Sequence, residues 1–305
     1  MSILQCGVPK SGNFWLYKII QQILTRKARD TMSYIQQHPI YPIASTWQLN
    51  FPDQAKIDVL EVTDLQYSYR ISSIFRMPIE DIDSYVGQSP HVWTHSPVCA
   101  RTPQLLPLFD KKVYIIRDPR DRALSAARYY CSDYMLKYFP QEEKDPGRFL
   151  DKNFEYLMHE WVWHVFDYLR LTKAFDIHVT FFEGLLLDFQ VELERLLNYL
   201  ETPLSDQQKS QLEEAVSFKI LKRKNPKHLK KGQAGYWMDQ LSDEHFEKAE
   251  IIAGPLMRFL GYPSERDGDM HFSHEMELYA LNDLKQEILR SQKQLYASIH
   301  YQTPN

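Results

Sequence analysis

The sequence is poor in cysteine. Its three cysteines, Cys6, Cys99 and Cys131, are odd in number, far apart and without a CxxC pair. This pattern argues against a disulfide framework and against a zinc ribbon, because both depend on paired or closely spaced cysteines. We therefore expect a protein of a reducing compartment, the cytoplasm, and no metal site.

A long apolar segment is also missing. No apolar run approaches the roughly 20 residues with which a helix crosses a bilayer, and strand-like residues begin at about Ile3. We expect neither a signal peptide nor an N-terminal anchor, and no membrane span. The formal net charge is only −4, which does not suggest a nucleic-acid partner. Any basic site would have to be local.

What the chain does have is an alternation of strand-like and helical segments over 305 residues. Apolar runs within residues 3–8, 113–116 and 178–182 predict buried strands, and apolar residues at helical spacing follow each of them. This order predicts an α/β fold with a central, mainly parallel sheet flanked by helices. We expect one domain over residues 1–262, with a linker and a C-terminal helix in residues 263–305.

The first strand, turn and helix contain a candidate anion site. Pro9, Ser11 and Gly12 form a turn that places Lys10 and free backbone N–H groups at a helix N-terminus. Unpaired donors and the positive end of the helix dipole favour an anion there. Lys10 precedes Gly12, whereas the Walker pattern has its lysine after the second glycine. We interpret the turn as a phosphate-binding loop of another kind.

Three further stretches stand out. Residues 117–122 form a charged turn at the carboxyl end of a strand, where open α/β sheets bind ligands. Residues 217–235 crowd lysine and arginine into one segment. Residues 25–90 are rich in proline, aromatic residues and glutamine, and most of this segment has no clean period. We expect it to be irregular, either as acceptor-binding loops or as a packed surface excursion.

Four segments resemble motifs of the sulfotransferases that use 3′-phosphoadenosine-5′-phosphosulfate (PAPS), most closely the cytosolic type. PKSGNFW at 9–15 resembles the 5′-phosphosulfate loop PKSGTTW, and WTHSP at 93–97 resembles KTHLP. VYIIRDPRDRALS at 113–125 resembles the 3′-phosphate strand, turn and helix, and LKKGQAGYW at 229–237 resembles the late RKGxxGDW loop. The resemblance implies a P-loop nucleotide-kinase-like fold and sulfuryl transfer from PAPS to a hydroxyl or amine of a small-molecule acceptor.

The resemblance also implies roles for individual residues. Lys10 would stabilise charge on the leaving phosphate, and His95 would act as general base toward the acceptor. The product, 3′,5′-adenosine bisphosphate (PAP), carries two phosphates, which accounts for two anion sites. The implied nucleotide-binding residues are Lys10, Ser11, Gly12, Asn13, Phe14 and Trp15 for the 5′ end and the adenine; Arg117, Ser125, Lys230, Lys231 and Gly232 for the 3′-phosphate; and Phe182, Ser217 and Phe218 around the adenine.

The chain departs from the family pattern at several positions. Asn13 and Phe14 replace two threonines, so backbone N–H groups must contribute more of the binding of the 5′-phosphate. Trp93 replaces a lysine near the transferring sulfuryl group, Lys230 replaces an arginine, and Tyr236 replaces an aspartate. The family's KxxxTVxxxE dimer segment has no match. A homodimer would therefore form through the C-terminal helix, whose approximate heptad pattern also suits docking on its own domain.

Two other functions stay open at the level of the sequence. A P-loop kinase acting on a small metabolite would share the strand, loop and helix, but it needs a magnesium-binding acid and the Walker order. A non-catalytic nucleotide-binding or scaffolding module is compatible with the changes at Asn13, Phe14 and Trp93.

Overall fold

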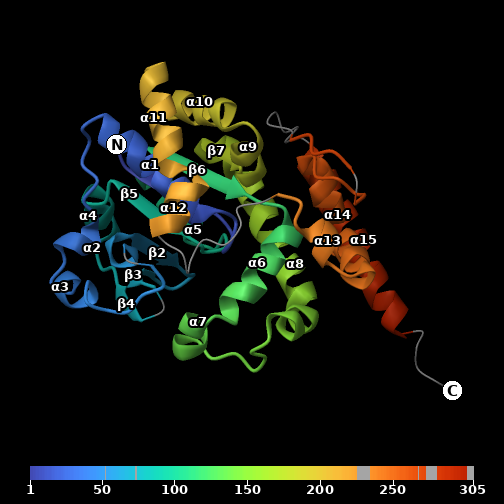
Figure 1. Ribbon diagram of the computed structural model, residues 1–305. Coiled ribbons are helices and arrows are strands. Elements are labelled where there is room, and N and C mark those ends of the chain that lie inside the picture. Colours follow the sequence, from blue (N-terminus) through green and yellow to red (C-terminus); the bar gives the residue numbers. More distant parts are fainter. Residues whose placement is uncertain (52, 73, 225–233, 267, 273–279, 301–305) are drawn as a thin grey trace.

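The fold is built on one central sheet. The computed structural model describes residues 1–51, 53–72, 74–224, 234–266, 268–272 and 280–300 (Figure 1). Within these residues the sheet has seven strands in the order β4-β3-β2-β5-β1-β6-β7. The strands are β1 (Ile3–Cys6), β2 (Asp58–Val62), β3 (Tyr67–Ile71), β4 (Phe75–Pro78), β5 (His91–Thr94), β6 (Lys111–Ile116) and β7 (Ile177–Phe181).

Five neighbouring strands, from β2 to β7 in the sheet order, run parallel, and near one edge β3 pairs antiparallel with both β2 and β4. The predicted mainly parallel sheet is therefore confirmed. The register pairs Cys6 of β1 with Thr94 of β5 on one side and with Tyr114 of β6 on the other. The carboxyl ends of these strands consequently meet at one edge of the sheet, as expected for a parallel α/β arrangement.

Both faces of the sheet are covered by helices, because successive residues of each buried strand point to opposite sides. Ile3 and Val113 pack with α1 (Asn13–Arg26), α10 (Phe189–Tyr199) and α11 (Asp206–Val216) on one face. Leu4 and Tyr114 pack on the other face with α6 (Pro119–Tyr130), α8 (Pro146–Phe175) and α14 (Asp243–Leu260). Figure 1 shows the two helical layers on either side of the central strands.

The remaining elements are short helices in the connections and one long helix near the C-terminus. They are α2 (Tyr34–Gln37), α3 (Tyr41–Ala44), η1 (Gln54–Lys56), α4 (Ile82–Gly87), α5 (Thr102–Leu105), η2 (Leu106–Leu108), α7 (Asp133–Tyr138), α9 (Phe182–Leu187), α12 (Phe218–Lys224), α13 (Trp237–Gln240) and α15 (Leu281–His300). Among the described residues, no helix is both long and apolar enough to cross a membrane.

Residues 25–90 differ from the sequence prediction, which expected no regular structure for most of this segment. They contain β2, the β3–β4 hairpin and several short helices. The strands are only four or five residues long, and polar residues such as Asp58, Ser68 and Arg70 interrupt their apolar pattern. Asp58 is fully buried and accepts hydrogen bonds from the backbone N–H groups of Tyr34 and Ile35. Its polarity is therefore satisfied locally, which a hydrophobic pattern does not reveal.

The C-terminal helix α15 packs on α14 of the same chain (Figure 1). Leu281, Leu284 and Ile288 are buried in this contact. The hydroxyl of Ser291, which interrupts the apolar pattern, donates a hydrogen bond of 2.6 Å to the carbonyl oxygen of Ile251. Of the two uses considered for this helix, docking on its own domain is confirmed. A homodimer through it stays a prediction.

Candidate functional site

The candidate residues come together at the carboxyl edge of the sheet. Lys10 follows β1, His95 follows β5, Arg117 follows β6 and Phe182 follows β7. All four line one cavity of about 950 Å³, to which α6 adds Ser125. The sequence-predicted residues that line this cavity are Lys10, Gly12, Asn13, Phe14, Trp15, His95, Arg117, Ser125, Phe182 and Phe218.

Not every predicted residue lines the cavity. Ser11 belongs to the loop between β1 and α1 but is fully buried. Its hydroxyl has no hydrogen-bond partner among the described residues. Ser217 lies at the junction of α11 and α12, where its hydroxyl accepts a hydrogen bond of 3.4 Å from the backbone N–H of Ile220. Lys230, Lys231 and Gly232 lie outside the described residues.

The loop between β1 and α1 has an unusual backbone. Lys10 has a φ of 73° and Gly12 a φ of 93°. Both values lie in the left-handed region, which residues other than glycine rarely adopt. At Gly12 a β-carbon would also overlap the ring of Phe182. The carbonyl oxygens of Pro9 and Lys10 accept hydrogen bonds from Arg122 (3.0 Å) and Arg117 (3.2 Å). The loop is therefore held in a strained shape beside the first N–H groups of α1.

Asn13 fixes this loop from inside. Its side-chain Nδ2 donates a hydrogen bond of 2.8 Å to the carbonyl oxygen of Val8, and Gln5 Nε2 donates one of 2.8 Å to the carbonyl oxygen of Asn13. The Asn13 side chain is only 3% exposed. The amide that stands in place of a hydroxyl is thus engaged within the loop.

Lys10 lies in a strongly positive environment. Burial, together with the charges of Arg117 and Arg128, lowers the pKa of Lys10 from 10.5 to about 8. Its ammonium lies 4.3 Å from the centre of the Tyr129 ring, a cation–π contact that supplies partial compensation. Three cations, Lys10, Arg117 and Arg128, thus come together at this end of the cavity. Such a convergence suits an anion-binding site, because a bound anion relieves their mutual repulsion.

His95 is held as a neutral imidazole. Its Nδ1–H donates a hydrogen bond of 2.6 Å to the carbonyl oxygen of Gly7, and the indole N–H of Trp93 donates one of 3.0 Å to Nε2. These two bonds assign the tautomer with the proton on Nδ1. Burial lowers the pKa of His95 to about 3. The basic lone pair therefore exists on Nε2, where Trp93 covers it.

An aromatic cluster forms the other end of the cavity. The Trp15 ring centre lies 4.7 Å from that of Phe218 and 5.7 Å from that of Phe182. Trp15 is fixed by a 2.9 Å hydrogen bond from its indole N–H to the carbonyl oxygen of Val216. The guanidinium of Arg117 lies 4.3 Å above the Phe182 ring. Flat aromatic surfaces beside a cation suit a purine base and its attached phosphate.

Phe14 lies in a different part of the cavity. Its ring contacts that of Phe51 at 4.7 Å, and both belong to a buried cluster with Tyr17, Ile57 and Trp93. Two of the departures from the family pattern, Phe14 and Trp93, thus pack in one apolar cluster. This cluster borders the His95 end of the cavity rather than the aromatic end.

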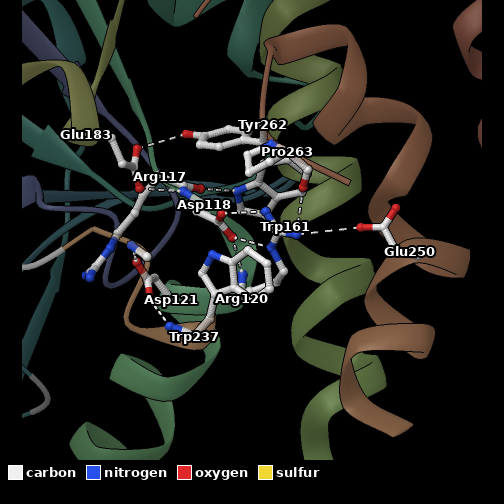
Figure 2. A network of polar contacts seen from close by, with 11 residues as sticks. Arg117, Asp118, Arg120, Asp121, Trp161, Glu183, Trp237, Glu250, Tyr262 and Pro263 are labelled. Carbon is white, nitrogen blue, oxygen red and sulfur yellow. Dashed lines mark hydrogen bonds and ion pairs between the residues drawn. The ribbon is translucent and has the colours of Figure 1, made fainter. Parts of the chain in front are cut away.

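A buried polar network supports the turn after β6 (Figure 2). Asp118 caps α6 and pairs with the guanidinium of Arg120 at 2.8 Å. The Asp118 N–H donates a 2.9 Å hydrogen bond to Glu183, which also accepts one of 3.0 Å from the hydroxyl of Tyr262. Trp161 donates to the carbonyl oxygen of Arg117 at 2.9 Å. These contacts fix the backbone that carries Arg117.

The same network fixes the end of the basic segment. Asp121 accepts hydrogen bonds of 2.8 Å from the backbone N–H groups of both Gly235 and Trp237, and the Arg120 guanidinium lies 3.6 Å from the Trp237 ring centre. Burial and the neighbouring charge of Asp118 raise the pKa of Asp121 to about 6. Figure 2 shows Trp237 beside Asp121 and Arg120 of α6.

Sequence reasoning missed several residues of the cavity, in particular Arg70, Arg128 and Tyr129. Arg128 follows Ser125 by three residues on one helix, so helical spacing was a usable signal. Arg70 lies on β3, in a segment for which no strand was expected; the short alternation of apolar and polar residues in Tyr67–Ile71 was the signal for this strand. Among the described residues, no group of three or more His, Cys, Asp or Glu side chains is placed to hold a metal ion.

Comparison with known proteins identifies the family. The sulfotransferase domain model matches residues 2–265. Sulfotransferase 1A1 of Bos taurus is 27% identical over 195 residues, which cover 54% of this chain and 63%, less than two thirds, of that relative.

Two solved structures share the fold. One is mouse sulfotransferase SULT7A1 complexed with PAP, with a TM-score of 0.55, 18% identity and 84% coverage of each chain. The other is retinol dehydratase in a complex with retinol and PAP, with a TM-score of 0.56, 17% identity and coverage of 89% of this chain and 83% of that one. Together with the family match over most of its length, this likeness means that the chain belongs to the sulfotransferase family.

Proposed function

We propose that the protein transfers the sulfuryl group of PAPS to a hydroxyl or amine of a small-molecule acceptor. The observation that supports this most is the single cavity that joins Lys10, His95, the Arg117 turn and an aromatic slot. Two fold relatives are complexes with PAP, and one of them also contains retinol. The family match favours sulfuryl transfer over the kinase that the sequence left open.

In this proposal the adenine lies against Trp15, Phe182 and Phe218. The 3′-phosphate contacts Arg117 and Ser125. Lys230, Lys231 and Gly232, which the family resemblance assigns to the same phosphate, lie outside the described residues. The 5′-phosphosulfate lies on the loop of residues 10–15. Because the Asn13 side chain is bonded to Val8, the backbone N–H groups at the start of α1 are the donors left for this phosphate.

The chemical step is an in-line displacement at sulfur. The acceptor oxygen or nitrogen forms a bond to sulfur while the bond from sulfur to the bridging phosphate oxygen breaks, and the acceptor proton passes to His95 Nε2. Lys10 donates to the bridging oxygen, where negative charge develops. The bound anion raises the pKa of Lys10 toward its ordinary value, because its negative charge offsets the burial and the neighbouring positive charges that lower this pKa.

His95 must exchange its partner during this step. In the free protein its Nε2 accepts a hydrogen bond from Trp93, so the acceptor hydroxyl or amine has to replace the indole N–H. A pKa of about 3 describes a weak base. Loss of the indole donor and the arrival of the PAPS negative charges both favour the imidazolium and so raise this pKa toward the working range.

The acceptor would occupy the His95 end of the cavity. Its wall combines the apolar residues Phe14, Phe51 and Val59 with polar groups such as Ser72 and Tyr134. The Ser72 and Tyr134 hydroxyls are hydrogen-bonded to each other. A mixed lining of this kind suits a small molecule with an apolar body and a few polar groups.

The test is transfer of ³⁵S from labelled PAPS to a panel of phenols, alcohols, steroids and amines. PAP binding is measured in parallel by calorimetry. We expect PAP binding, a labelled product with at least one acceptor, and a loss of about 100-fold or more in kcat for His95→Ala. Full activity of that variant would remove His95 as the base. PAP binding without transfer to any acceptor would favour the non-catalytic module, for which the covered Nε2 of His95 is the supporting observation.

A further inference from the structure

Arg70 brings a positive charge to the cavity from β3, next to the edge strand β4. It lies on β3, opposite Val59 of β2 and Arg76 of β4. Cross-strand partners share one face of a sheet, and Val59 lines the same cavity as Arg70. The Arg70 side chain therefore enters the cavity from the hairpin, whereas Lys10 and Arg117 enter it from the strand ends on the other side of His95.

The Arg70 charge is uncompensated within the described part of the chain. The neighbouring carboxylate, Glu61, pairs with Arg76 at 3.1 Å instead. Arg70 Nε is buried and has no hydrogen-bond partner among the described residues. A buried guanidinium donor without an acceptor costs free energy. Its persistence in a cavity wall points to an acceptor that arrives with a ligand.

The charge of Arg70 acts near both proposed catalytic residues, His95 and Lys10. Its charge contributes to the lowered pKa of His95 and opposes the rise in the pKa of Tyr129. The Tyr129 ring in turn lies under the ammonium of Lys10. Arg70 is thus close to the region between Lys10 and His95. Under the proposed function, the sulfur atom crosses that region on its way to the acceptor.

The sulfuryl group in transit needs cationic partners besides Lys10. Its three oxygens carry negative charge, and strand β5 offers no cation beside His95, because Trp93 stands two residues before it. A guanidinium can donate two parallel N–H bonds to two oxygens of a flat SO₃ group. It therefore matches the shape that the group adopts at the midpoint of transfer.

We propose that Arg70 binds the sulfuryl group under transfer and is a further catalytic residue of this sulfotransferase. The proposal rests on the proposed function. The covalent step is unchanged: the sulfur to phosphate-oxygen bond breaks, the sulfur to acceptor bond forms and the acceptor proton goes to His95. Arg70 neither gains nor loses a proton in it.

The experiment compares Arg70→Gln, Arg70→Lys and, as a matched control, the double variant Glu61→Gln/Arg76→Gln, which removes the neighbouring ion pair without leaving Glu61 free beside Arg70. Steady-state kcat and acceptor KM are measured with PAPS, and the Kd of PAP, which lacks the sulfuryl group, is measured by calorimetry. We expect about a 100-fold fall in kcat for Arg70→Gln and a smaller fall for Arg70→Lys. The Kd of PAP should change less than about twofold in every variant, and both quantities should stay near wild type in the Glu61→Gln/Arg76→Gln control.

Three results would overturn the proposal. An unchanged kcat in Arg70→Gln would show that the sulfuryl group does not need this residue. An equal loss of PAP affinity would assign Arg70 to the nucleotide or to folding. A raised acceptor KM with unchanged kcat would assign it to an anionic group of the acceptor. If the wild-type protein transfers sulfuryl to no acceptor, the proposed function fails and this proposal falls with it.

Discussion

The contact between Trp93 and His95 decides how readily the proposed base can act. The indole N–H occupies Nε2, the atom that has to receive the acceptor proton. The acceptor therefore competes with an internal donor for the same lone pair. A neutral hydrogen bond of this kind is worth about 0.5–1.5 kcal/mol, which is enough to weaken acceptor binding measurably.

Trp93→Phe should release this competition. The ring volume is largely kept while the N–H is lost, so we expect the acceptor KM to fall roughly 3- to 10-fold with kcat changed less than about threefold. Steady-state kinetics at saturating PAPS measure both. Trp163→Phe, on the outer part of α8 and outside the described cavity lining, serves as the control. An unchanged KM would mean that the indole leaves Nε2 at no cost.

Lys10 gives PAP binding a predictable pH dependence. Its pKa is lowered to about 8 in the free protein, and the anionic ligand favours the protonated form. Above pH 8 the free protein has lost this proton and must take it up again on binding. We therefore expect the Kd of PAP to be flat below about pH 7 and to rise toward tenfold per pH unit above 8. Calorimetry between pH 6.5 and 9.5 measures it.

The variant Lys10→Met provides the internal comparison for this pH series. It cannot take up the proton, so its Kd for PAP should be weaker but nearly independent of pH over the same range. If Lys10→Met kept the wild-type slope, another group would be responsible for the proton uptake.

At the scale of elements, α6 contributes to the anion site both at its N-terminal end and along its length. Arg117 precedes its N-terminal cap, Ser125 faces the cavity, and Asp121 holds the backbone of Gly235 and Trp237. The segment that carries Lys230 and Lys231 in the sequence is thus tied to α6 at its C-terminal end. The link between α6 and the residues that follow this basic segment depends on one buried carboxylate.

Asp121→Asn tests whether the contact of Asp121 with Gly235 and Trp237 supports nucleotide binding. One of the two backbone N–H groups loses its acceptor, so we expect a loss of about 1–3 kcal/mol in unfolding free energy and about a tenfold rise in the Kd of PAP. Urea unfolding and calorimetry measure the two effects. Asp239→Asn, an exposed change two residues beyond Trp237, should alter neither. Unchanged PAP affinity in Asp121→Asn would show that this anchor does not serve the nucleotide site.

The elements around the nucleotide were predictable from the sequence because each consists of an apolar strand, a turn and an amphipathic helix. The hairpin β3–β4 was missed although Tyr67–Ile71 alternates apolar and polar residues, because this period of two extends over only five residues in a segment without a clean period elsewhere. Arg70 was therefore missed as well, since its place in the cavity follows only from strand pairing.

At the scale of the whole molecule, the sheet divides the interior into two cores, and the polar network around Glu183 lies where the strand ends, α6 and the segment after α14 meet. Glu183 is fully buried and binds both the Asp118 N–H and the Tyr262 hydroxyl. Burial and the charge of Asp118 raise its pKa from 4.5 to about 8. The stability of the fold should therefore depend on pH near neutrality, far above the range of an ordinary carboxyl group.

The sign of this dependence follows from proton uptake. Between about pH 4.5 and 8 the folded protein keeps a proton on Glu183 that the unfolded chain has lost. Raising the pH therefore lowers the contribution of this group to the free energy of unfolding, by up to about 1.4 kcal/mol per pH unit. The buried histidines His91, His95 and His164 have lowered pKa values, so they act in the opposite sense below about pH 6.5. Between pH 6.5 and 8 these histidines contribute little. Burial raises the pKa of Asp58 to about 7, so this carboxyl group acts in the same sense as Glu183 in the lower part of the window, and only a Glu183 variant separates the two.

Glu183→Gln tests this directly, because the amide imitates the protonated carboxyl group and has no proton to lose. Between pH 6.5 and 8 we expect the unfolding free energy of the variant to fall less steeply than that of wild type. Over this range the difference between the two should shift in favour of the variant by up to about 2 kcal/mol. Urea unfolding at four pH values measures both curves. Glu201→Gln, an exposed change, should parallel wild type. Parallel curves for Glu183→Gln would place the proton elsewhere in the network.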